Sequence, residues 1–293
     1  MNREESIISV ENLSLSYEDF EVLNNVSFKV KRGTCMVIMG GSGCGKSTLL
    51  KTITGLIEPR EGRVEVLGIN TATLDEESQS ELAKRLGVMF QYGALLNSLT
   101  VGENIALPLE MHTDLPPAQI EEIVRLRLAS VSLEGTQDRM PSELSGGMRK
   151  RVALARAMAL DPEILFCDEP SAGLDPVTAA EIDELLLTLN RALGITIVIV
   201  THELLSIDRL DGRLLMLDEG QVVFSGSVGE AQRSTHDVVY PFFTLEKHHR
   251  DKNHYRSHKQ QRRDWQRKRY SLALPSRYET LPRYDPRISS YCR

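Results

Sequence analysis

The chain has 293 residues, enough for one large domain or two small ones with a buried hydrophobic core. Hydrophobic residues make up 41% and charged residues 26%, which is typical of a globular protein. No run of 18 or more apolar residues occurs, so the sequence excludes a membrane-spanning helix. The four cysteines form no Cys-x-x-Cys pair, and we interpret them as reduced thiols of a cytosolic protein.

The net charge of −6 conceals two parts of opposite charge. Residues 247–293 contain 14 Lys and Arg against 4 Asp and Glu, a net charge of +10. The first 246 residues therefore carry a net charge of −16, and this acidic body gives no general reason to expect nucleic-acid binding. We place a folded domain at residues 1–245 and a basic C-terminal tail at 246–293.

The tail shows no apolar periodicity, and three interpretations of it stay open. A charged run at a chain end is usually a solvated arm, and we favour that interpretation. The positive charge could instead hold the chain near an anionic membrane leaflet or the acidic surface of a second copy. A metal site is the least favoured interpretation. Its candidate ligands would be His248, His249, His254 and His258, but no carboxylate or thiol at a fixed spacing completes such a ligand set.

Short apolar runs predict two kinds of β-strand. The segment from Ile7 to Val30 predicts paired strands, at Ile8–Val10, Leu13–Leu15 and Val26–Val30. Three later aliphatic runs, each followed at once by glycine or polar residues, are typical of buried parallel strands: Met36–Met39, Ile164–Cys167 and Ile197–Val200. Ligands bind at the carboxyl ends of such strands.

Helical segments lie between these strands. Four helices are predicted, at about Lys46–Gly55, Ile120–Val131, Met148–Leu160 and Pro176–Leu193. Asp175 is a good N-terminal cap for the last of these, and the proline after it suits the first helical position. The alternation of strands and helices predicts an α/β fold.

A glycine-rich segment between the first buried strand and its helix fits the P-loop pattern Gly-x4-Gly-Lys-Ser. Its glycines let backbone N–H groups turn inward around phosphate oxygens, and the helix N-terminus adds its positive end. Lys46 supplies a point charge to the outer phosphates, and the hydroxyl of Ser47 can ligate Mg²⁺. The residues expected to contact the nucleotide here are Gly40, Gly41, Ser42, Gly43, Cys44, Gly45, Lys46, Ser47 and Thr48.

Two carboxylates follow the second buried strand. Asp168 is placed to hold Mg²⁺, directly or through water, and Glu169 to orient and deprotonate the attacking water. Acidic residues after a buried strand are often plain loop residues, and alone this pair would be ambiguous. The P-loop in the same chain favours the catalytic interpretation.

A second helix start offers another anion site. Leu144–Met148 reads Leu-Ser-Gly-Gly-Met just before a predicted helix, so the Ser145 hydroxyl and the N–H groups of Gly146 and Gly147 face an anion there. Ser-Gly-Gly is also a common turn and helix cap. Its position, 23 residues before Asp168, argues against that bland interpretation.

With these motifs in order, residues 6–240 or so resemble the ABC-transporter ATPase family. The resemblance implies further roles: Tyr17 stacks on adenine, Gln91 senses Mg²⁺ and the attacking water, and His202 contacts the γ-phosphate. It also implies that the loop ending at Asp175 crosses a dimer interface. Each residue has a plainer alternative: a strand-end tyrosine, an ordinary glutamine, a satisfied loop histidine, and the helix cap already noted for Asp175.

The resemblance also implies an architecture. It implies a P-loop NTPase (RecA-like) core with an antiparallel β subdomain and an α-helical subdomain at about residues 92–160. Two copies sandwich two ATP molecules, and Leu144–Met148 of one copy closes over ATP on the P-loop of the other. A separate integral-membrane permease docks on the helical subdomain, which places the chain at the cytoplasmic face of the inner membrane.

Segments that flank the motifs resemble the ATPases of Mla/Mce-type phospholipid transporters: Gln91–Leu96, Glu103–Leu109 and Met140–Leu144. That family implies two ATPases, two permease subunits, a ring of Mce-type lipid-binding proteins and sometimes a STAS-domain subunit. The ATPase of an amino-acid or ion importer is the close alternative. A soluble ABC ATPase of translation or DNA repair is disfavoured, because it normally carries two cassettes or a long coiled coil.

Overall fold

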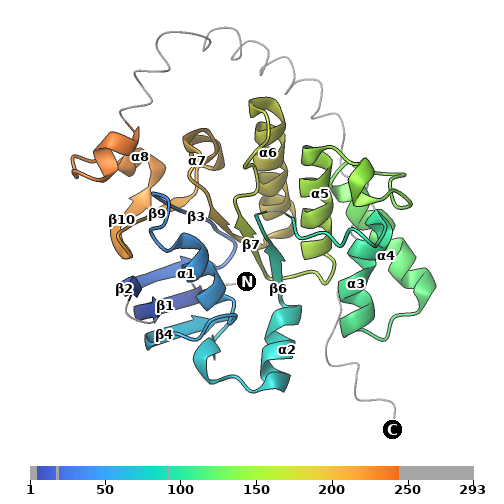
Figure 1. Cartoon of the computed structure of the whole chain (residues 1–293), viewed down its shortest axis with the longest axis horizontal. Helices are drawn as coiled ribbons and strands as arrows, with labels where there is room; N and C mark the ends of the chain where they lie inside the picture. Colours follow the sequence, from blue (N-terminus) through green and yellow to red (C-terminus); the bar gives the residue numbers. More distant parts are fainter. Residues whose placement is uncertain (1–4, 18–19, 92, 244–293) are drawn as a thin grey trace. The chain divides into compact units, whose positions relative to one another are not determined.

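In the computed structural model, residues 5–17, 20–91 and 93–243 are described, and they belong to one unit, Met1–Phe243 (Figure 1). The predicted basic tail and its four histidines lie outside these residues. None of the described helices is long and apolar enough to cross a bilayer.

An antiparallel sheet contains β1 (Ser6–Tyr17), β2 (Phe20–Lys31), β4 (Glu61–Val66) and β5 (Ile69–Asn70), in the order β2-β1-β4-β5. The prediction of separate strands at Ile8–Val10 and Leu13–Leu15 is wrong, because both lie within β1. Between these two segments the pairing of β1 with β2 is irregular, and the strand continues through it. Asn12 at this point has φ of 51°, a left-handed conformation that asparagine tolerates. Its N–H donates to the Ser27 hydroxyl of β2 at 2.8 Å.

A second sheet has the order β10-β9-β3-β8-β7-β6. Its strands are β3 (Cys35–Gly40), β6 (Leu86–Met89), β7 (Ile164–Asp168), β8 (Thr196–Val200), β9 (Arg213–Asp218) and β10 (Gln221–Ser227). Only β10 runs antiparallel to its neighbour. The three predicted aliphatic strands are confirmed as β3, β7 and β8, and β7 and β8 are buried at every residue.

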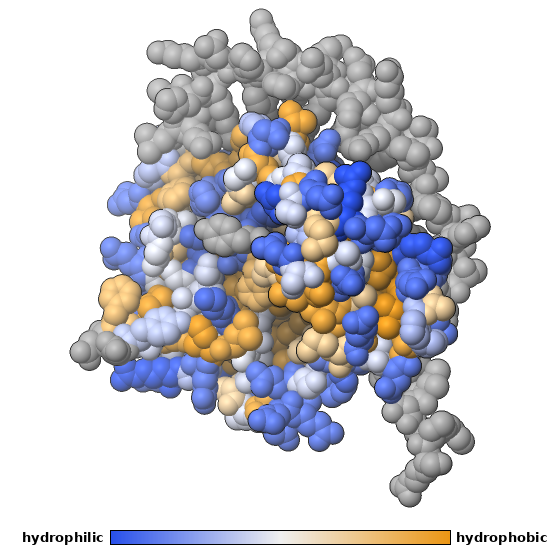
Figure 2. Space-filling view, turned by 45° about the vertical axis from the view of Figure 1, so that its right-hand side comes forward, coloured by the Kyte–Doolittle hydropathy of each residue, from blue (hydrophilic) through white to orange (hydrophobic). Residues whose placement is uncertain are grey.

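The described helices are α1 (Lys46–Ile53), α2 (Glu76–Lys84), α3 (Val101–His112), α4 (Pro117–Ser130), α5 (Gly146–Ala157), α6 (Pro176–Leu193), α7 (Leu204–Leu210) and α8 (Val228–Ala231), with 3₁₀ turns at Thr71–Thr73 and Pro141–Glu143. The predicted helices are confirmed, and Asp175 caps α6 as expected. Helix α5 begins two residues earlier than predicted, because the Ser145 hydroxyl accepts the Met148 N–H and thus caps it. On the face that turns α3–α5 forward, hydrophobic surface gathers near the middle (Figure 2).

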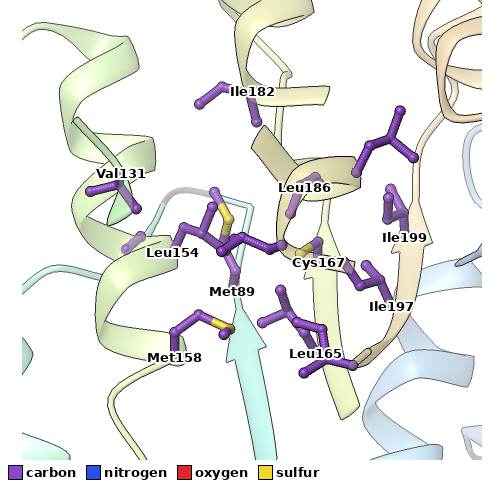
Figure 3. Close-up of a cluster of buried hydrophobic side chains, with 14 of the residues drawn as sticks. Met89, Val131, Leu154, Met158, Leu165, Cys167, Ile182, Leu186, Ile197 and Ile199 are labelled. Atoms are coloured by element: carbon purple, nitrogen blue, oxygen red, sulfur yellow. The ribbon is translucent and has the colours of Figure 1, made fainter. Parts of the chain in front are cut away.

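The core lies on both faces of the parallel sheet. Successive side chains of a strand point to opposite faces, so Val37 and Met39 of β3 pack with α3–α6, whereas Met36 and Ile38 pack with α1 and the antiparallel sheet. Figure 3 shows the first of these clusters, where Leu165 and Cys167 of β7 lie between Met89, Leu154 and Met158 on one side and Ile197 and Ile199 of β8 on the other. Burial on both faces explains why these strands are continuous apolar runs.

One ion pair is buried beside this core. Asp183 of α6 is fully buried and accepts a hydrogen bond from Arg209 of α7 at 2.9 Å. Burial raises the pKa of Asp183, while Arg209 and Ser206 act in the opposite direction. The carboxylate is therefore costly to keep ionised, and its charge depends on Arg209.

We expect Arg209→Met to lower the free energy of unfolding by about 3–5 kcal/mol at pH 7, because it leaves a buried carboxylate unpaired. Since burial raises the pKa of Asp183 in the folded state, acidification should protonate it and shrink the difference from the parent. Arg125→Met, which removes an exposed pair with Glu122, is the control and should cost less than about 1 kcal/mol. Urea unfolding that gives equal losses for both variants would contradict this.

Candidate functional site

The predicted site residues follow four adjacent strands. Strands β3, β8, β7 and β6 are parallel neighbours, so their carboxyl ends meet at one edge of the sheet. The P-loop follows β3, His202 follows β8, and Gln91 follows β6, while Asp168 is the last residue of β7 and Glu169 comes directly after it. This edge is where ligands bind in open α/β sheets.

Two P-loop glycines are required by close packing as well as by conformation. Gly40 has φ of 151°, and a Cβ there would lie 2.1 Å from the Leu217 carbonyl oxygen. Gly45 has φ of 96°, and its Cβ would lie 2.7 Å from Leu23 Cδ2. Gly43 also has positive φ but faces open space, so its conformation alone favours glycine. The loop thus keeps its shape only with the glycines of the sequence pattern.

The Lys46 ammonium lies within the loop. Its Nζ donates to the carbonyl oxygens of Gly40 at 3.0 Å and Gly41 at 2.7 Å. Cys44 lies close to it and is buried, and burial raises the pKa of that thiol although Lys46 acts against the rise. Cys44 is therefore a packed neutral thiol, and Lys46 is the cation at this end of the site.

A hydroxyl and a carboxylate meet at the start of α1. Ser47 Oγ lies 3.5 Å from Asp168 Oδ1. Burial raises the pKa of Asp168, while the Ser47 contact and the nearby lysines oppose the rise. Both groups offer hard oxygen ligands, which fit Mg²⁺. Across the described ranges no cluster of three His, Cys, Asp or Glu could hold a metal ion.

Glu169 is fixed in a strained conformation beside this pair. Its φ of 50° lies in the left-handed region, which is uncommon for a residue with a side chain. Its N–H donates to the Val200 carbonyl of β8 at 2.8 Å, and its Oε1 lies 2.6 Å from His202 Nδ1. Its Oε2 is buried and has no hydrogen-bond partner within the described part of the chain. That free oxygen can accept a proton or a hydrogen bond from a small ligand.

Comparisons with known proteins agree with this geometry. Residues 23–172 match the protein family described as ABC transporter. The chain is 38% identical to the intermembrane phospholipid transport system ATP-binding protein MlaF of Haemophilus influenzae, over 76% of this chain and 84% of that protein. It is 40% identical to the methionine import ATP-binding protein MetN of the same organism, over 74% of this chain and 62% of MetN.

A solved dimeric ATP-binding cassette in a post-hydrolysis state, bound to ADP and Pi, is 33% identical to the chain and superposes with a TM-score of 0.70. The superposition covers 75% of this chain and 98% of that cassette. The chain belongs to the ABC transporter family. It is an ATPase subunit that hydrolyses ATP with Mg²⁺, and cassettes of this family dimerise and work with membrane permease subunits.

Two other predicted residues of this ABC cassette make local contacts, and a third is exposed. Ser145 caps α5, and Asp175 accepts the N–H groups of Val177 and Thr178 at 3.0 and 3.1 Å. The helix-cap alternative for Asp175 is therefore correct, whatever else it does in a dimer. Tyr17 lies at the end of β1 with 50% of its surface exposed.

Gly146 and Gly147 form the first turn of α5. A Cβ on Gly147 would lie 2.5 Å from Thr178 Cγ2, so this position needs glycine for α5 and α6 to pack. The Ser-Gly-Gly segment thus has a packing role inside the cassette, in addition to its predicted contact with an anion.

Lys150 is the site residue that sequence reasoning missed. It lies on α5 with 8% of its surface exposed, and its Nζ donates to the carbonyl oxygens of Gln91 and Glu169, the latter at 2.9 Å. Lysine is rarely buried, so a lysine in a charged run attracts no notice. The sequence did contain a signal for its burial. Lys150 comes three residues after Gly147 and four before Leu154, a spacing that places all three on the same, buried face of the helix.

Proposed function

We propose that this chain is the ATPase subunit of a phospholipid transporter, with Glu169 as the general base of ATP hydrolysis. The observation that carries the catalytic assignment is the environment of the Glu169 carboxylate. One of its oxygens contacts His202 at 2.6 Å, and the other is buried without a hydrogen-bond partner in the residues described. A carboxylate held in this way can orient a water molecule and accept its proton.

The proposed binding residues surround this carboxylate. Lys46 and the backbone N–H groups of Gly40–Thr48 bind the phosphates, and Tyr17 stacks on the adenine. Ser47, Asp168 and Gln91 hold Mg²⁺, which when bound neutralises charge on the phosphate oxygens. The 3.5 Å separation of Ser47 from Asp168 supports a shared ligand there.

His202 completes the proposed hydrolytic group. It directly follows Thr201, whose N–H donates to the Ile38 carbonyl at 3.1 Å and so ties the end of β8 to the strand that precedes the P-loop. The imidazole is 61% exposed and contacts Glu169 through Nδ1. It can therefore contact the γ-phosphate while it restrains the Glu169 side chain.

The proposed active unit is a dimer with composite sites. Ser145 is exposed at the N-terminus of α5, where backbone N–H groups and the helix dipole favour an anion. We propose that this segment of one copy closes over ATP on the P-loop of the other, with the loop at Asp175 in the interface. The similar solved cassette is dimeric and carries hydrolysis products, which supports this arrangement.

The phospholipid assignment rests on similarity. MlaF aligns with this chain over 84% of its length, whereas more than a third of MetN lies outside the alignment. The flanking segments Gln91–Leu96, Glu103–Leu109 and Met140–Leu144 point the same way. An amino-acid importer is the second candidate, because the identity to MetN is 40%.

The proposed partners are permease subunits in the inner membrane, with the chain at their cytoplasmic face. Mce-type lipid-binding and STAS-domain proteins complete the proposed assembly. Exposed hydrophobic side chains suit permease docking: Phe90 directly precedes the segment Gln91–Leu96, Leu96 ends it, and Met111 lies on α3.

Glu169→Gln should keep ATP binding and dimerisation but lower the turnover number about 10²- to 10⁴-fold, because the amide cannot accept the proton. Lys46→Ala should instead weaken nucleotide binding. Steady-state ATPase rates and equilibrium binding of a fluorescent ATP analogue separate the two effects. Turnover of Glu169→Gln near the parent rate in the assembled transporter would show that Glu169 is not the base.

A mixture of two inactive chains tests the composite sites. Lys46→Ala damages the P-loop side of a site and Ser145→Arg the opposite side, so each heterodimer of the two should retain one intact site. Neither homodimer should retain any. Differently tagged chains allow the heterodimer to be purified and its ATPase rate measured. An inactive heterodimer, once shown to form, argues against composite sites.

Purification of the tagged full-length chain with its membrane partners tests the substrate. We expect it to bring down a permease and an Mce-type protein, with phospholipid detected in the complex by mass spectrometry. Phospholipid vesicles should stimulate its ATPase, and methionine should not. Recovery of a permease with an amino-acid-binding protein, and stimulation by that amino acid, would favour the importer.

A further inference from the structure

One buried cation joins two loops that lie far apart in the sequence. Lys150 Nζ donates to the carbonyl of Gln91, 59 residues away, and to that of Glu169, 19 residues away. These two residues follow neighbouring strands, β6 and β7. A single ammonium thus fixes the backbone at both positions, and it does so from a third element, α5.

The Glu169 contact falls on the strained residue. A left-handed conformation at a residue with a side chain persists only where its surroundings over-determine it. The Glu169 carbonyl also accepts from the Ala172 N–H at 3.3 Å, a long hydrogen bond. The charged, 2.9 Å contact from Lys150 is therefore the stronger restraint on this carbonyl.

Helix α5 holds the other loop at further points. Arg156 donates to the carbonyl oxygens of Gly93 and Ala94, both at 2.8 Å. The segment after β6 is therefore attached to α5 along its length, and Lys150 alone extends this attachment to Glu169 among the contacts of the described chain. Burial lowers the pKa of Lys150, and the carboxylates of Glu169 and Asp168 oppose the fall.

The same helix begins at Ser145, about 7 Å from Lys150 along the axis at 1.5 Å per residue. We propose that Lys150 is a positioning residue for ATP hydrolysis: it ties Gln91 and Glu169 of one copy to the helix whose N-terminus faces the nucleotide of the partner copy. This inference rests on the proposed roles of Gln91, Glu169 and Ser145. Lys150 thereby holds Gln91 and the general base in place within the site of its own copy.

Lys150→Met should lower kcat about 10- to 100-fold, as expected when catalytic groups are displaced but not removed. The KM for ATP should stay within about threefold, because the P-loop is untouched. Lys150→Gln should behave likewise, since its amide is one bond shorter and cannot reach both carbonyls. Lys150→Arg should recover most of the rate. Unchanged kcat in both Lys150→Met and Lys150→Gln would overturn the proposal.

Arg151→Met is the matched control. Arg151 is the next residue of α5, also largely buried, and it donates to the Val131 carbonyl and pairs with Glu181, both at 2.9 Å. It should lower the melting temperature without lowering kcat at temperatures where the chain is folded. Equal loss of kcat in both variants would mean that any buried cation of α5 matters, and the specific role of Lys150 would be wrong.

Hydrogen–deuterium exchange of the full-length chain without nucleotide gives a readout independent of turnover. Lys150→Met should speed exchange in the peptides that contain Gln91 and Glu169. Arg151→Met should leave them near the parent rate. Unchanged exchange in both peptides of Lys150→Met would overturn the positioning role.

The purified heterodimer of Lys46→Ala and Ser145→Arg chains locates the effect. Its active site uses Gln91 and Glu169 of the Ser145→Arg chain and the helix start of the Lys46→Ala chain. Lys150→Met should reduce the rate only when placed in the Ser145→Arg chain. Loss from the other chain alone, or equal loss from both, would overturn the proposal.

Failure of the underlying assignments would look different. Normal turnover of Glu169→Gln, or an inactive parent heterodimer, would contradict the proposed roles of Glu169 or of the composite site. In that case the kcat and exchange of the homodimeric Lys150 variants still decide whether Lys150 holds the Gln91 and Glu169 loops in place for turnover. Loss of kcat with faster exchange supports it, and parent-like values refute it.

Discussion

The register of the parallel sheet is the constraint on which the site depends. Ile38 of β3 pairs with Val200 of β8, which pairs with Asp168 of β7, while Met89 of β6 pairs with Cys167. Paired strands lie about 4.8 Å apart, so residues just beyond this row occupy adjoining positions. The P-loop, His202, the two carboxylates and Gln91 therefore form one group, although they are spread along the chain.

That register is stable because both faces of the sheet are buried. If one strand slipped by one residue, its side chains that now pack against α3–α6 would point toward the antiparallel sheet, and those of the other face would point toward α3–α6. This rigid sheet also supports a strained residue at its edge. Glu169 keeps a left-handed backbone because Val200, Lys150 and His202 each fix a different part of it.

Helix α5 connects three parts of the candidate site. Ser145 caps its N-terminus, Lys150 lies on its buried face, and Arg156 donates hydrogen bonds to the segment after β6. Overall sequence identity does not separate the two candidate substrates, because relatives named for phospholipid and for methionine transport share comparable identity with the chain.

The sequence by itself determined the P-loop, the carboxylate pair, the buried strands and the cap of α6, because each depends on residues adjacent in the chain or on a short period. It did not determine that β1 is continuous across Asn12, since a bulge is settled by the partner strand. Nor did it reveal the pair of Asp183 and Arg209 or the contacts of Lys150. Those depend on residues 19 to 59 positions apart, which only the packing of helices on the sheet brings within hydrogen-bonding distance.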